Sequence, residues 1–167
     1  MVFTIPEGLH PDLNPLALLV GTWRGKGRGE YPNIEGFEFA QEVVFNHDGR
    51  PFLNYYSRSW ILDKEGEILR PGGSETGFWR IKPNNVLEVV LAHNTGISEG
   101  WVGTFDGPKI QLVLDQGYSA PSERLLLQVF ACTDLLLANF FTHMTWRQRD
   151  KSYRPISGHH LNERASK

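Results

Sequence analysis

The stretch GTWRGKGRGEYP, residues 21–32, decides the fold. Side chains alternate across a β-strand, so Trp23, Gly25, Gly27 and Gly29 share one face, and the charged residues between them share the other. Because the charged face must meet solvent, the inner face is one large ring followed by three positions without a side chain. Glycine weakens a strand interior but permits the sharp bending that closure of a barrel requires. The same row also leaves interior space, which a bulky flat ligand could occupy.

The rest of the chain continues this β character, with segments rich in aromatic and β-branched residues separated by turn formers. Connections such as NHDGRP, KPNN, HNTG, DGP and CTD favour hairpins, so we expect a mostly sequential antiparallel sheet. An open sheet of so many strands would curl, and closing it into a barrel removes its exposed edges. The expected strands are 21–30, 37–46, 52–62, 74–82, 86–92, 97–105, 109–115, 124–131 and 135–146, with a further strand in the tail left open.

One short helix is expected before the first strand. Asn14 is its cap, Pro15 suits its first position, LALLV supplies the apolar turn and Gly21 ends it. The predicted fold class is therefore all-β: a single antiparallel up-and-down barrel of about ten strands, lipocalin-like or fatty-acid-binding-protein-like, with one N-terminal helix.

Length and charge limit the classes of function that this chain can have. The 167 residues form most simply one domain, with residues 1–12 as an N-terminal extension and 147–167 as a basic segment of six Lys/Arg against two Asp/Glu. The formal charge of −2 argues against a nucleic-acid binder. Cys132 is the single cysteine, so no intramolecular disulfide can form. A membrane-length apolar run and a leader pattern are both missing, which predicts a cytoplasmic chain without a membrane partner.

Four blocks in order resemble the nitrobindin family of haem-binding β-barrels: GTWRGKGRGEYP, FEFAQEVVFNHDGRPFLNYYSRSW, SETGFWRIKP and LEVVLAHNTGISEGWVGT. This resemblance implies haem b held inside the barrel, with a ferric iron ligated by one histidine of the last strand. It also implies binding of nitric oxide and isomerisation of peroxynitrite to nitrate, with no catalytic group beyond the haem iron. The cofactor-binding residues that it implies are Trp23, Gly25, Gly27, Asn33 and His160.

The ligand position rests on the C-terminal HHLNERASK, where His160 precedes Leu161 as in the family pattern. A one-residue shift of strand register would bring His159 inward instead, and His143 in FFTHMTW is a further alternative ligand. The residues that follow His160 are polar, unlike the wall of a haem pocket. The alternative function is therefore a nitrobindin-like barrel without haem that binds a fatty-acid-like or other apolar molecule and is not an enzyme.

The remaining histidines are interpreted as structural. His47 and His93 fall in or beside turns, where they would lie at the surface or stabilise the turn, and His10 is expected to be exposed. The aromatic stripes of the second and third strands are interpreted as core packing. The expected partner is a small molecule, namely nitric oxide, peroxynitrite or an apolar compound, and a homodimer is left open.

Overall fold

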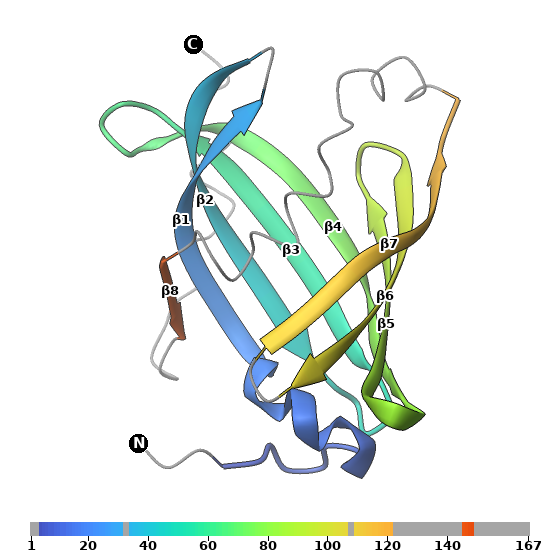
Figure 1. Cartoon of the computed structure of the whole chain (residues 1–167). Coiled ribbons are helices and arrows are strands. Elements are labelled where there is room, and N and C mark those ends of the chain that lie inside the picture. Colours follow the sequence, from blue (N-terminus) through green and yellow to red (C-terminus); the bar gives the residue numbers. More distant parts are fainter. Residues whose placement is uncertain (1–3, 32–33, 107–108, 122–144, 149–167) are drawn as a thin grey trace.

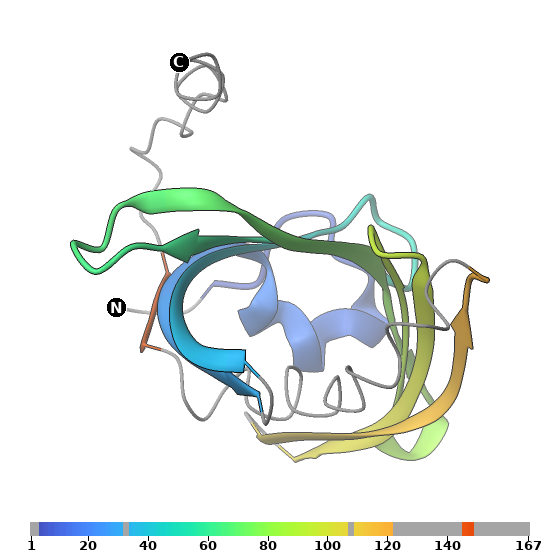
Figure 2. The same ribbon diagram turned by 90° about the horizontal axis from the view of Figure 1, so that it is seen from above.

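The computed structural model describes residues 4–31, 34–106, 109–121 and 145–148. A curled antiparallel sheet dominates it, and a 3-10 helix lies across one end (Figures 1 and 2). The elements are η1 (Pro11–Leu19), β1 (Gly21–Tyr31), β2 (Ile34–Asn46), β3 (Leu53–Leu62), β4 (Ile68–Lys82), η2 (Pro83–Asn85), β5 (Val86–His93), β6 (Ile97–Asp106), β7 (Lys109–Ser119) and β8 (Thr145–Gln148).

The strand order confirms the predicted sequential topology. It runs β7-β6-β5-β4-β3-β2-β1-β8, so each strand from β1 to β7 pairs with its neighbours in the chain. All of these pairs are antiparallel, and β8 pairs antiparallel with the outer edge of β1. Seen from above, the sheet curls around through most of a ring (Figure 2).

Some predicted strand limits were wrong, and others are not tested. The second strand begins at Ile34, the fourth begins at Ile68 and the seventh extends to Ser119. Each of these extensions continues a hydrogen-bonded ladder through residues that sequence propensity alone assigns to turns. The expected strand 124–131 lies outside the described residues, as does all of 135–146 except the two residues that open β8. Closure of the barrel and a count of about ten strands stay predictions.

The predicted helix limits were also wrong. The helix begins earlier, at Pro11, with His10 as its cap: the Asp12 backbone N–H donates to His10 Nδ1 at 3.2 Å. It is a 3-10 helix, which has about three residues per turn. Leucines three residues apart therefore lie on one face and are buried against the sheet: Leu13, Leu16 and Leu19. His10 was expected to be exposed, but two thirds of its side chain is buried: only 33% is exposed.

An aromatic layer forms the core beside the helix. Trp79 lies at its centre, with its ring centroid 5.2 Å from that of Phe45 and 6.1 Å from that of Tyr55. Leu53, Val89 and Leu91 are buried in the same cluster, which also receives the leucines of η1. Burying large rings removes much apolar area from water and stabilises the fold. Phe45 is therefore a core residue, as predicted for the aromatic stripe of the second strand. On the third strand the prediction was wrong for Tyr56, which faces outward and is 45% exposed.

The glycine row of β1 faces inward as predicted. Trp23 pairs with Val43, and Gly29 pairs with Phe37, which places the row on the core side of the sheet. At Gly29 the interior space is filled by the chain itself, since an added Cβ would lie 2.5 Å from the Phe37 ring. The row is thus used in part for close packing of a neighbouring ring.

Two glycines of β4 give a matched test of backbone packing. A Cβ on Gly77 would collide with the carbonyl oxygen of Val90, whereas a Cβ on Gly73 would meet nothing within 4 Å. We expect Gly77→Ala to lower the free energy of unfolding by about 1–3 kcal/mol, because backbone must shift to admit the methyl group. Gly73→Ala should change it by about 0.5 kcal/mol or less. Urea unfolding of both variants measures the difference, and equal midpoints would contradict the close approach at Gly77.

Candidate functional site on the concave face

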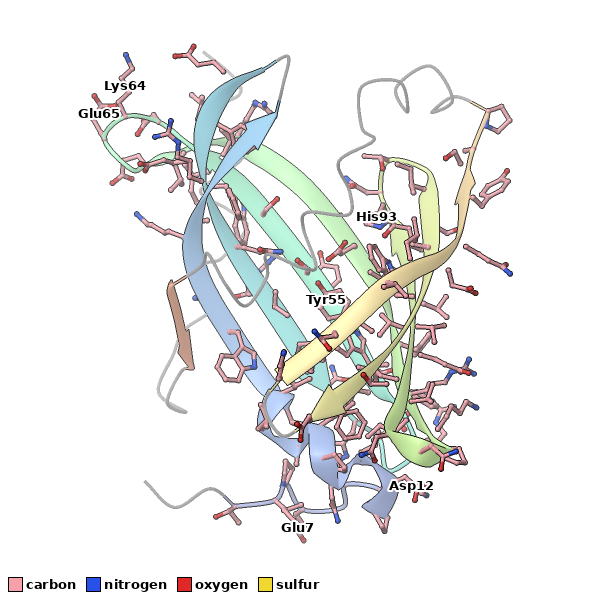
Figure 3. All side chains as sticks on the ribbon, in the orientation of Figure 1. Glu7, Asp12, Tyr55, Lys64, Glu65 and His93 are labelled. Atoms are coloured by element: carbon pink, nitrogen blue, oxygen red, sulfur yellow. The ribbon has the colours of Figure 1, made fainter. Side chains whose placement is uncertain are left out.

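Above the aromatic layer, the concave face of the sheet carries a chain of polar side chains. They come from four neighbouring strands, β3 to β6, and the pairing register places them on the side of the core. Figure 3 shows two of them, with Tyr55 near the middle of the sheet and His93 nearer the end opposite η1. We call this set the interior polar chain; its members are Tyr55, Glu75, His93, Glu99 and Trp101.

Hydrogen bonds and ion pairs connect every member of the interior polar chain. The Tyr55 hydroxyl donates to Glu75 Oε1 at 2.5 Å, and Glu75 Oε2 lies 3.3 Å from His93 Nδ1. His93 Nε2 lies 3.2 Å from Glu99 Oε2, and the Trp101 indole N–H donates to the same oxygen at 3.0 Å. A single imidazole is therefore held between two carboxylates.

The pKa values of three members of the interior polar chain are all raised above their ordinary values: those of Tyr55, Glu75 and His93. Burial raises the pKa of Glu75, which outweighs the hydrogen bond from Tyr55 and the charge of His93. Burial alone would lower the pKa of His93, but the hydrogen bond to Glu99 and the charges of both glutamates raise it overall. Burial, followed by the Glu75 charge and the hydrogen bond to it, raises the pKa of Tyr55 well above its usual value.

The two contacts of His93 are best satisfied by one proton in each. Each ring nitrogen of His93 faces a carboxylate oxygen, so each of the two contacts is satisfied when it holds one proton. That condition is met by an imidazolium between two carboxylates, or by a neutral ring beside a protonated Glu75. In both cases the set Glu75, His93 and Glu99 carries a net charge of about −1.

The structure corrects the interpretation of His93 as a surface or turn-stabilising residue. His93 ends β5 and its side chain is only 14% exposed, between two glutamates of the neighbouring strands. Sequence reasoning also missed Glu75 and Glu99. The signal was present in the alternation of β6, where Glu99 shares the inward parity of Trp101 and Phe105. A charged residue in an otherwise apolar inward row indicates either a buried pair or a functional group. His47, in contrast, does lie in the connection between β2 and β3, as predicted.

Of the cofactor residues predicted from sequence, the structure places three. Trp23 packs against the core and its indole N–H donates to the Leu19 carbonyl oxygen at 2.7 Å, which ties β1 to η1. Gly25 and Gly27 lie inward beside it, opposite Gln41 and Phe39. The other candidates lie outside the described residues: Asn33, His143, His159 and His160.

Glu42 provides a contrast on the convex face. It is 6% exposed, and two arginines neutralise it: Arg24 Nε donates to Oε2 at 2.5 Å, and Arg58 Nε donates to Oε1 at 2.9 Å. The two arginines thus bring two positive charges to the single negative charge of Glu42. Buried carboxylates in proteins are normally paired in this way.

The described part of the chain holds neither a group of side chains suited to a metal ion nor a membrane-spanning helix. Within residues 4–31, 34–106, 109–121 and 145–148, no three His, Cys, Asp or Glu side chains are arranged to hold a metal ion. In that same part, no helix is long and apolar enough to cross a membrane.

Fold and site together define a class: a curled antiparallel up-and-down sheet of the β-barrel type whose concave face carries a buried, hydrogen-bonded polar chain. The family model for the THAP4-like, heme-binding beta-barrel domain matches residues 12–162. The chain therefore belongs to this haem-binding β-barrel family, the nitrobindin family.

Individual relatives agree with this assignment. A protein of Nocardioides sp. named peroxynitrite isomerase is 50% identical over 115 residues, which are 69% of this chain and 70% of the relative. A ferric nitrobindin-like protein of Streptomyces griseus is 50% identical over 66% of this chain, but the match spans only 60% of that relative. The crystal structure of Rv2717c from M. tuberculosis is 40% identical, with a TM-score of 0.59 over 68% of this chain and 73% of that one.

Proposed function

We propose that this protein binds haem b in the barrel interior, binds nitric oxide at the ferric iron and isomerises peroxynitrite to nitrate. The observation that carries the proposal is the match of the haem-binding family model over residues 12–162, which spans the described sheet and also the candidate ligand His160. Relatives named peroxynitrite isomerase support the reaction.

Small side chains line part of the inner face of the described sheet, where the proposal places a flat, largely apolar group. Between the aromatic layer and the end of the sheet opposite η1, the inward positions of β1 and β3 are small: Gly25 and Gly27, then Ser57 and Ser59. Small inward side chains leave room that larger ones would fill. The aromatic layer would form the apolar floor of such a site.

In this proposal, the protein binds and orients the haem and excludes water, while the cofactor supplies the reactive metal. A haem held by one histidine would supply an iron able to bind a small ligand such as nitric oxide. His160 would provide the ligating imidazole. Trp23, fixed by its hydrogen bond to Leu19, would hold the floor of the site in place. No side chain is assigned a catalytic role beyond this.

The test is an absorption titration with hemin. The wild-type protein should give a Soret band, and His160→Ala should lose it, because the imidazole proposed to hold the iron would be gone. His159→Ala and His143→Ala are matched controls that should retain the band. A band that survives His160→Ala but disappears in one control would move the ligand to that residue. A wild-type protein that gives no band would instead favour the alternative, a non-enzymatic barrel for a fatty-acid-like or other apolar molecule.

We also propose a cytoplasmic location and small-molecule partners only, with a homodimer as the assembly to be tested. Large hydrophobic side chains are exposed on the convex face of neighbouring strands, including Tyr56, Phe78 and Val90. The molar mass in solution, measured by light scattering, distinguishes a monomer from a dimer.

A further inference from the structure

Apart from His93, the two glutamates of the interior polar chain have no cationic partner among the described residues. Glu75 contacts Tyr55 and His93, and Glu99 contacts His93 and Trp101. The inward cross-strand neighbours of the two glutamates, other than His93 itself, are uncharged: Ser57, Leu91 and Gly117.

This arrangement differs from the one at Glu42, where two arginines surround a single carboxylate. In the interior polar chain, one imidazole pairs with two carboxylates, so the three groups together keep a net negative charge. The side chains that share it are well shielded from solvent, with Glu75 17%, His93 14% and Glu99 4% exposed. An uncompensated charge at such a depth is costly unless something positive is bound nearby.

We propose that Glu75, His93 and Glu99 act as a fixed negative charge that stabilises the ferric state of a haem bound in the same interior. The inference rests on the proposed function. A ferric iron in a porphyrin dianion carries a core charge of +1, and the ferrous form carries none. The negatively charged side chains therefore attract the oxidised haem core but not the uncharged reduced core. This difference lowers the reduction potential of the haem.

The dimensions of the fold make this interaction effective. Strands lie about 4.8 Å apart, so a barrel of eight to ten strands is roughly 15–20 Å across, and a ligand in its interior lies within about 10 Å of the inner wall. At that distance, inside a protein, charges interact more strongly than in water and are little screened by salt. Net charge and burial around a cofactor are among the factors that set its reduction potential.

The experiment is a spectroelectrochemical titration of the full chain reconstituted with hemin, following the Soret band. The decisive variant is Glu75→Gln/Glu99→Gln, because it makes the set more positive by at least one charge whichever protonation state His93 adopts. We expect the reduction potential to become more positive, with at least a tenfold change in the ferric-to-ferrous ratio at a given potential, which is about 59 mV for one electron. If the double variant does not fold, Glu75→Gln measured at pH 6 should shift the potential in the same direction.

The matched control is Glu38→Gln/Glu88→Gln, which removes two carboxylates from the convex face, where Glu88 pairs with Arg80 at 2.8 Å. Its potential should stay close to that of the wild type. A double interior variant that binds hemin and shifts no more than this control would overturn the inference and leave the proposed function intact. A wild-type protein that shows no Soret band at all would overturn both. The two failures are therefore distinguishable.

Discussion

Trp79→Ala is expected to lower the free energy of unfolding by about 3–5 kcal/mol, the cost of emptying a large aromatic site in a packed core. Trp79 is 1% exposed and forms an edge-to-face contact with Phe45 at 5.2 Å. It also lies between the helix end of the sheet and the interior polar chain, so its loss would loosen the layer that supports Tyr55. Urea or guanidinium unfolding, followed by tryptophan fluorescence or circular dichroism, measures the change.

Phe78→Ala is the matched control, since Phe78 adjoins Trp79 on β4 but faces outward and is 49% exposed. Its removal gives up the ring contact with Phe52 at 5.3 Å and little burial, so a loss of about 1 kcal/mol or less is expected. Similar losses for the two variants would mean that Trp79 is not a central core residue.

Trp79→Phe keeps an aromatic ring at this position but removes the indole nitrogen, so it tests the two contributions separately. The indole Nε1 of Trp79 is buried without a hydrogen-bond partner in the described structure. Replacing a donor that has no partner removes a desolvation penalty of about 1–3 kcal/mol, which offsets part of the lost packing. Trp79→Phe should therefore be much less destabilising than Trp79→Ala. A full loss in both would indicate that the indole nitrogen contributes an interaction of its own.

Alternation and turn chemistry were enough to predict the sheet. The inward row of Trp23 and the glycines of β1 was read correctly, because a strand with charges at every other position has only one face that can be buried. Sequential antiparallel pairing followed from the short connections between strands. The helix limits were not predictable in this way: Asn14 and Pro15 suggested an α-helical start, while the three-residue spacing of Leu13 and Leu16 favours a 3-10 helix.

The candidate site was less predictable because its polar members come from different strands. His93 follows an apolar run and precedes an Asn-Thr-Gly turn, so local sequence places it at the surface. Only the pairing of β4 with β5 and of β5 with β6 brings Glu75 and Glu99 to its two ring nitrogens. Such contacts depend on strand register, which a single sequence does not specify residue by residue.

The same contacts predict that the protein loses stability as pH rises above neutrality. The pKa of His93 is raised above its ordinary value of 6.5 by the hydrogen bond to Glu99 and the two glutamate charges, which together outweigh burial. The folded state then keeps a proton that the unfolded state has released. The resulting stabilisation is fully present below pH 6.5 and is lost as pH rises through the folded-state pKa.

Glu75 acts in the same direction, since burial raises its pKa above the ordinary 4.5. Both groups therefore contribute stability at lower pH, and neither favours the alkaline side. For one proton, the free energy of unfolding should fall by at most about 1.4 kcal/mol per pH unit within this window. Chemical unfolding at half-unit steps from pH 5.5 to 9 gives the slope.

His93→Gln should flatten that slope, because glutamine can hydrogen-bond to the two carboxylates but cannot bind a proton in this range. The stability difference between wild type and variant should be largest at the acidic end and shrink as pH rises. His47→Gln is the control: it removes a histidine from the connection between β2 and β3, outside the interior polar chain, and should leave the wild-type slope unchanged. A His93→Gln slope equal to that of the wild type would show that the imidazole between Glu75 and Glu99 is not the group that releases a proton as pH rises.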